Sequence, residues 1–245
     1  MRMVSFGPDC ALKYHIEQYV HGGKHVQSDL FDWAVAGLSA VALVLEHLAD
    51  EEPYFGVASW EHVGQTATAH HVFLHTPTGL RSLHDAPAAK FESIALAQGA
   101  VAARHETRRL RLRELLCGAE RACCVHIADA DNTDSPQPLP DRAAIARVFA
   151  ALRLLGTAGH ALVILIDGRC SAPDALGTEG VIITDLRGFL RAQASDHGAP
   201  PWMRVQYNWK QVLADMAATA TKVLEPTTFA AGLEPDVVDE STLSG

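Results

Sequence analysis

The chain has 245 residues, of which 48% are hydrophobic and 20% are charged, and its formal net charge is −9. This composition predicts a globular protein with a sizeable core and excludes disorder over the whole length. The acidic balance argues against a generally basic nucleic-acid surface, and no apolar stretch approaches the about 18 residues that span a membrane. We therefore expect neither a nucleic-acid partner nor a membrane partner.

The cysteines are odd in number and include an adjacent pair, but they form neither a C-x-x-C motif nor a zinc-ribbon spacing. The N-terminus lacks a basic region followed by an apolar one, so it does not predict a secretory signal. We expect reduced thiols and a cytoplasmic location. The five cysteines are Cys10, Cys117, Cys123, Cys124 and Cys170.

In the first half of the chain, short apolar runs predict strands and apolar positions at helical spacing predict helices. In chain order these are a strand at 3–6, helices at 11–20 and 37–48, a strand at 71–74, and a helix at 88–116 with a break near 99. Asp9 is a candidate N-cap of the first helix, which would put Cys10 in its first turn.

The second half predicts a βαβ unit. Residues 122–127 and 161–166 are continuously apolar, as in strands buried on both faces, and 141–155 has a helical pattern. A strand at 180–186 and a helix at 208–218 complete the pattern. We expect one three-layer α/β domain with a mostly parallel sheet over residues 1–218, followed by a weakly ordered acidic tail at 219–245.

Cys10 is the leading candidate for chemistry, because it lies where the first strand turns into the first helix. Unpaired backbone N–H groups and the positive end of the helix dipole lower the pKa of a thiol at this position. The same N–H groups can hold an oxyanion. The alternative interpretation is a small, buried and inert thiol.

A nucleophilic cysteine needs a histidine base and a third group that orients the imidazole. His84 is favoured as the base because it lies in a loop before the long helix. Asp85 follows it in the chain, so its side chain would usually diverge from His84, and Asp129 at the end of a predicted strand is the alternative orienting acid. A solvated loop histidine beside a turn aspartate is the competing interpretation.

Four further residues are candidates for substrate binding. Asp32 and Trp33 either anchor the core or line the same pocket as Cys10. Arg108 falls on the apolar stripe of the long helix, so it needs a partner, either a substrate carboxylate or phosphate or an internal acid such as Asp32. Arg109 is either a second substrate ligand or part of an ordinary solvated face.

The acidic loop after the predicted strand at 122–127 is a weak metal motif. Asp129, Asp131 and Asp134 lie at the carboxyl edge of the sheet, but Asp134 occupies the position where a calcium loop needs glycine. We interpret the loop as solvated and predict neither a metal nor a cofactor.

Four short motifs follow one another in the first half of the chain. They are Val4-Ser5-Phe6-Gly7-Pro8-Asp9-Cys10, Leu30-Phe31-Asp32-Trp33, His84-Asp85 and Arg108-Arg109-Leu110-x-Leu112. Their order resembles a bacterial family of domains catalogued as papain-like cysteine peptidases. The resemblance extends over residues 3–170 and departs from the family at Phe6, Leu30 and Leu112. The Cys-Gly-x-Cys-Trp signature and upstream glutamine of papain itself are missing.

The resemblance implies that Cys10 is the nucleophile and His84 its base, in a cysteine-dependent hydrolase or peptidase acting on a peptide or small-molecule substrate. One alternative is a transferase, such as a glycosyltransferase, in which Arg108 and Arg109 bind a phosphate while Asp129 and Asp131 hold a metal. Another is a non-catalytic binding module built on a degenerate enzyme fold.

Overall fold

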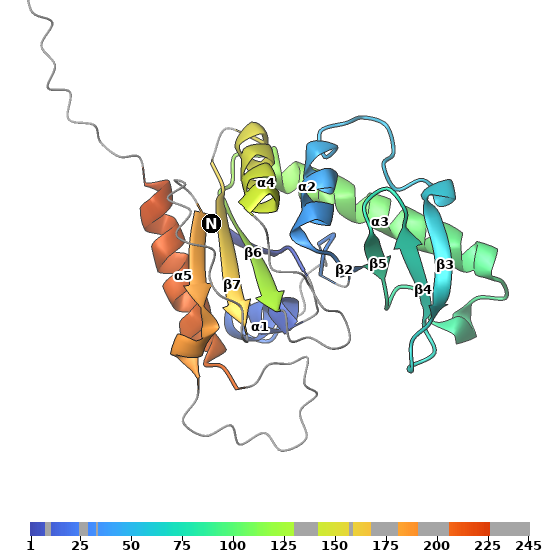
Figure 1. Ribbon diagram of the computed structural model, residues 1–245, viewed down its shortest axis with the longest axis horizontal. Helices are drawn as coiled ribbons and strands as arrows, with labels where there is room; N and C mark the ends of the chain where they lie inside the picture. The colour runs from blue at the N-terminus through green and yellow to red at the C-terminus, as the bar shows by residue number, and fades with distance from the viewer. Residues whose placement is uncertain are drawn as a thin grey trace, which may run out of the picture.

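The computed structural model describes residues 1–7, 11–24, 29–32, 34–129, 142–156, 159–167, 181–190 and 206–225. At its centre is a four-stranded sheet in the order β1-β6-β7-β8, in which every neighbouring pair is parallel (Figure 1). Its strands are β1 (Arg2–Ser5), β6 (Ala122–Asp129), β7 (Ala161–Asp167) and β8 (Val181–Asp185). The predicted parallel sheet is confirmed.

Helices cover both faces of this sheet. Met3 packs in a core with α1 (Ala11–Tyr19) and α5 (Trp209–Leu224), whereas Val4 packs with α2 (Leu38–Glu46) and α4 (Arg142–Leu154). Successive side chains of a strand point to opposite faces, so the two clusters lie on opposite sides of the sheet. The domain therefore has the three layers that the sequence predicts.

A second, antiparallel sheet has the order β2-β5-β4-β3 and packs against the long helix α3 (Ile94–Leu116). Only β4 lies where the sequence predicts a strand. β2 has just two residues, and β3 alternates buried or half-buried with exposed side chains instead of forming an apolar run. These strands are β2 (Ala34–Val35), β3 (Trp60–Gln65), β4 (His71–His75) and β5 (Leu80–Ser82).

Two helix boundaries differ from prediction. α3 begins at Ile94, because Ser93 caps it by accepting a hydrogen bond of 3.3 Å from the N–H of Leu96. Residues 88–90 form a separate 3-10 turn, and α3 continues through Gly99, so the predicted start at 88 and break near 99 are wrong.

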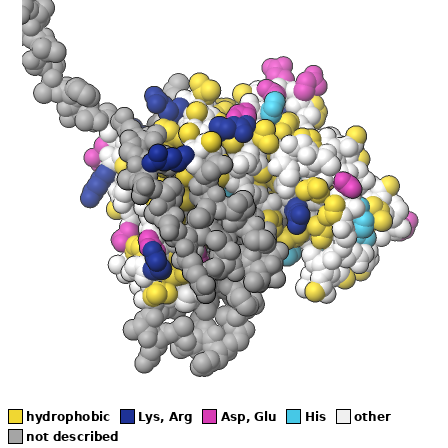
Figure 2. Space-filling view, viewed as in Figure 1, with side chains coloured by type: hydrophobic (Ala, Val, Ile, Leu, Met, Phe, Trp, Pro, Cys, Tyr) yellow, Lys and Arg dark blue, Asp and Glu magenta, His cyan; other side chains and the backbone are white. Residues whose placement is uncertain are grey.

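The C-terminal helix α5 continues to Leu224, six residues beyond its predicted end, so the predicted start of the tail at 219 falls within it. In the part of the chain that the structure describes, no helix has the length and apolarity needed to cross a membrane. Charged side chains of both signs are spread among hydrophobic and uncharged ones on the surface in Figure 2.

Candidate functional site

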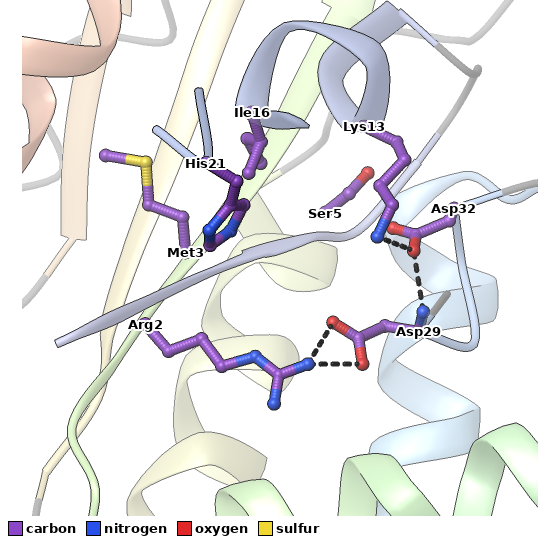
Figure 3. A pocket seen from close by; sticks show the side chains of 8 residues that line it. All are labelled: Arg2, Met3, Ser5, Lys13, Ile16, His21, Asp29 and Asp32. Carbon is purple, nitrogen blue, oxygen red and sulfur yellow. Dashed lines mark hydrogen bonds and ion pairs between the residues drawn. The ribbon is translucent and has the colours of Figure 1, made fainter. Parts of the chain in front are cut away.

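A cavity of about 360 Å³ lies beside β1, between that strand, α1 and the segment 29–32 (Figure 3). Its wall combines charged side chains with a hydroxyl and an apolar surface. The lining residues are Arg2, Met3, Ser5, Lys13, Ile16, His21, Asp29 and Asp32. Of the predicted site residues whose side chains the structure describes, Asp32 lines this cavity.

Lys13 and Asp32 form an ion pair of 2.9 Å in the cavity wall, although their side chains are only 5% and 1% exposed. Asp32 also accepts a hydrogen bond of 2.6 Å from the N–H of Asp29. Burial raises the pKa of Asp32 to about 6, against the opposing charge of Lys13. A carboxyl group with this pKa can be neutral or ionised close to physiological pH.

Arg2 and Asp29 form the second ion pair of the cavity. The Arg2 guanidinium donates through Nη2 to both carboxylate oxygens of Asp29, at 3.0 and 3.2 Å. The Arg2 side chain is 40% exposed and that of Asp29 is 8% exposed, so this pair lies nearer to solvent than the pair of Lys13 and Asp32.

Four residues of the predicted sites are not described at the level of their side chains. Cys10 and Trp33 lie outside the described residues, as does Asp131, the second acid of the transferase alternative. Asp129 closes β6 opposite Asp167, but its side chain also lies outside what the structure describes.

The backbone before Cys10 leaves the sheet through Gly7, which has a φ of +77° that favours glycine. A Cβ at Gly7 would lie 3.2 Å from the carbonyl oxygen of Ala36 and 3.6 Å from that of Ala34 in β2. Ala34 pairs with Ser82 of β5, two residues before His84. The parallel and antiparallel sheets therefore contact each other near Gly7. The chain continues from this region towards Cys10 after β1 and towards His84 after β5.

His84 lies in the exposed loop after β5, and its ring is 5.9 Å from that of His70, centroid to centroid. Partial burial lowers the pKa of His84, and the neighbouring His70 lowers it further. The imidazole is therefore mainly neutral at pH 7, as a general base requires.

The carboxylate of Asp85 is held by three neighbouring side chains. Its carboxylate accepts two hydrogen bonds of 2.9 Å from Arg108, one of 3.1 Å from Arg104 and one of 2.9 Å from the hydroxyl of Ser82. Burial raises the pKa of Asp85, but the charges of His105 and Arg108 outweigh it and bring the pKa to about 2. Asp85 therefore fixes the loop that carries His84 to α3.

The partner of Arg108 is thus Asp85 and not Asp32, the acid suggested from the sequence. Arg109 is fully buried, which excludes the predicted solvated face. It pairs with Glu106 at 2.7 Å and donates to backbone carbonyls of the loop after α2. Those carbonyls belong to His47, Leu48, Asp50 and Glu52. These contacts give Arg108 and Arg109 structural roles, and their contact with substrate stays a prediction.

Sequence reasoning missed several polar residues next to the candidate site. Arg2, Lys13 and Asp29 were not singled out, because single charged residues near a strand or helix end give no distinctive pattern. His126 had a weak signal as the one histidine in an apolar run; it is buried on β6, with Nδ1 3.0 Å from the carbonyl oxygen of Phe6.

A buried cluster of aromatic rings joins the antiparallel sheet to α3. The Trp60 ring lies 5.0 Å from that of His75 and 4.7 Å from that of His105, measured between centroids. Within the described residues, Trp60 Nε1 and both Nε2 atoms make no hydrogen bond. Burial lowers the pKa of His75 and of His105 to about 4.

Comparisons with family models, with curated proteins and with solved structures found no match to this chain.

Proposed function

We propose that the chain is a thiol-dependent acyl-transfer enzyme, a hydrolase of peptides or related acyl compounds, with Cys10 as its nucleophile. One observation carries the proposal: the cavity is walled by Ser5 and Lys13, which lie on either side of Cys10 in the chain. Cys10 and Lys13 are three positions apart in the chain, which limits the distance between their Cα atoms to about 11 Å.

The helix α1 begins at Ala11, the residue after Cys10. The unpaired N–H groups of a first helical turn and the positive end of the helix dipole favour the thiolate form of a cysteine that lies close to them. The same N–H groups stabilise the oxyanion that forms when a carbonyl carbon is attacked.

In the proposed reaction the proton of the Cys10 thiol passes to neutral His84, and the resulting thiolate attacks the carbonyl carbon and forms a tetrahedral oxyanion. The bond to the leaving amine or alcohol then breaks, and protonated His84 gives its proton to that group. Water next attacks the thioester while neutral His84 takes a proton from it, which releases the acid and restores the thiolate. One observation supports His84 as this base. Gly7, which precedes Cys10, lies against β2, and β2 pairs with β5, the strand that precedes His84.

Two other cysteines are poor nucleophiles. Cys123 and Cys124 are fully buried on β6, and burial raises the pKa of the Cys123 thiol to about 12 and that of Cys124 well above its ordinary value. Cys117 is exposed at the end of α3 and provides a matched control thiol.

The test measures the rate at which iodoacetamide labels each cysteine across pH, read by peptide mass spectrometry. We expect Cys10 to react with a thiol pKa below the free value of about 8.5 and faster than Cys117, and His84→Ala to change the pH profile at Cys10 only. A burst of p-nitrophenol from p-nitrophenyl acetate should disappear in Cys10→Ala and remain in Cys117→Ala. A Cys10 pKa at or above about 8.5, or a burst that survives Cys10→Ala, would overturn the proposal.

A further inference from the structure

Among the strands that the structure describes, β1 is at the edge of the parallel sheet. The N–H of Arg2 donates to the carbonyl of Arg121 at 2.9 Å, and that of Phe6 donates to the carbonyl of Val125 at 2.7 Å. In a parallel ladder both main-chain groups of one residue face the same neighbour, and those of the next residue face the other way. The N–H and C=O groups of Met3 and Ser5 therefore point away from β6.

The two residues that carry these outward-facing groups are buried from bulk solvent. Met3 is 9% exposed and Ser5 is 1% exposed, and the main chain of neither residue forms a hydrogen bond with any residue that the structure describes. The main chain along this edge therefore offers two donors and two acceptors with which an added strand can pair.

The cavity lies along this same edge. Arg2 and Met3 both line it, although their side chains lie on opposite sides of the β1 ribbon (Figure 3). A space that contacts both faces of a strand has to pass around its free edge. The cavity therefore gives a ligand access to the main chain of Met3 and Ser5.

We infer that this cavity binds a short free peptide in an extended conformation, whose main chain pairs with Met3 and Ser5. Alternating donors and acceptors two residues apart match the N–H and C=O groups of an added strand. The volume of about 360 Å³ is near the lower end of ligand pockets, which favours a peptide of two or three residues over a segment of a folded protein.

The charges of the cavity fit the two termini of such a peptide. Arg2 with Asp29 and Lys13 with Asp32 provide a cation and a carboxylate along the edge. A zwitterion can exchange partners with both pairs, its ammonium with a carboxylate and its own carboxylate with a cation. A phosphorylated ligand fits less well, because its negative charge would be repelled by the carboxylates of Asp29 and Asp32.

The inference rests on the proposed function for its chemistry, because the bound peptide would supply the acyl group that Cys10 attacks. Binding is nevertheless measured apart from catalysis, with full-length Cys10→Ala and Cys117→Ala proteins in calorimetry. The ligands are tripeptides with alanine, leucine, serine, lysine or glutamate at the central position.

We expect at least one tripeptide to bind both proteins alike. Methylation of its central amide nitrogen removes one donor and should weaken binding about tenfold, a typical effect of losing one main-chain hydrogen bond. Acetylating its N-terminus or amidating its C-terminus should also weaken binding. Failure of all five tripeptides to bind, or equal affinity for the methylated peptide, would overturn the inference.

A protein variant tests the same pairing from the other side. Met3→Pro removes an N–H that faces the cavity and leaves the ladder to β6 intact, and proline is tolerated when its missing donor faces the free edge of a sheet. We expect about tenfold weaker binding in Met3→Pro and no change in Arg187→Ala, whose guanidinium pairs with Asp185 next to β8. If Met3→Pro lowers the Tm strongly, the inference is tested instead by the affinity of the methylated peptide for the protein without this substitution.

The two proposals fail in different ways. Peptide binding together with an unreactive Cys10 would contradict the proposed function and support the peptide site. A reactive Cys10 without peptide binding would do the opposite.

Discussion

The carboxylate of Asp85 and the guanidinium of Arg108 form two parallel hydrogen bonds of 2.9 Å across 23 residues of sequence. The pair fastens the loop that carries His84 to α3, and both side chains are nearly inaccessible to solvent. Removing one partner of a buried pair leaves the other charge uncompensated, so the pair is a sensitive point of the fold.

Asp85→Asn should therefore lower the free energy of unfolding by about 3–5 kcal/mol, measured by urea denaturation. The control is Asp185→Asn, which breaks the exposed pair with Arg187 and should cost less than about 1 kcal/mol. Similar losses in the two variants would show that Asp85 does not hold the loop.

Arg109→Met should release the loop after α2, because Arg109 donates to the backbone carbonyls of His47, Leu48 and Asp50. We expect a loss of about 1–3 kcal/mol in the free energy of unfolding and faster amide hydrogen exchange in residues 47–52. Arg113→Met is the control, since Arg113 makes one exposed contact of 3.5 Å to the same loop. Unchanged exchange in Arg109→Met would contradict the assignment.

Gly7→Ala and Gly99→Ala should have opposite effects. The positive φ of Gly7 and the Ala36 carbonyl 3.2 Å from the added Cβ predict a loss of about 1–2 kcal/mol or more. Gly99 lies inside α3, where a Cβ meets nothing within 4 Å, so Gly99→Ala should gain about 1 kcal/mol. Thermal unfolding of both variants measures the difference, and stabilisation by Gly7→Ala would refute the strained turn.

The protein should lose stability as the pH falls from about 6.5 to about 4. Burial lowers the pKa of His75 and of His105 from 6.5 to about 4, so the unfolded chain binds protons that the folded chain does not. Such a contribution is complete above the unfolded pKa and is lost as the pH approaches the folded one. Asp85, with a folded pKa of about 2, extends the loss below pH 4.

Urea midpoints at pH 7.5, 5.5 and 4.5 measure this dependence. His105→Phe should flatten it, whereas replacing the exposed His47 should not. Asp32 contributes with the opposite sign, because its raised pKa of about 6 favours the folded state at low pH and loses that effect as the pH rises through 6. A midpoint independent of pH between 7.5 and 4.5 would contradict the buried neutral histidines.

The central layer of the fold could be predicted because its strands are buried on both faces. The apolar runs that predict β6 and β7 are continuous, and a parallel arrangement follows from the helix between them. The antiparallel sheet could not be predicted as a sheet, because β3 has the sequence Trp-Glu-His-Val-Gly-Gln. The exposed residues on one face of this strand interrupt the apolar pattern.

The candidate site was predictable only in part. Asp32 was singled out by its aromatic neighbours, but its partner Lys13 lies 19 positions away and carries no pattern of its own. The stripe of α3 indicated that Arg108 needs an acid, yet choosing Asp85 over Asp32 requires the packing of the loop onto α3. Periodicity identifies buried charges, whereas their partners depend on tertiary structure.

The free edge of β1 also bears on how copies of this chain behave towards one another. An exposed strand edge is a template on which another chain can pair and start aggregation. Here the segment 29–32 and α1 flank that edge, and the ion pair of Arg2 and Asp29 lies at one end of it. Charged side chains and a flanking helix are devices that oppose the addition of another strand to an edge, so the wall of the cavity also works against pairing with a second copy of the chain.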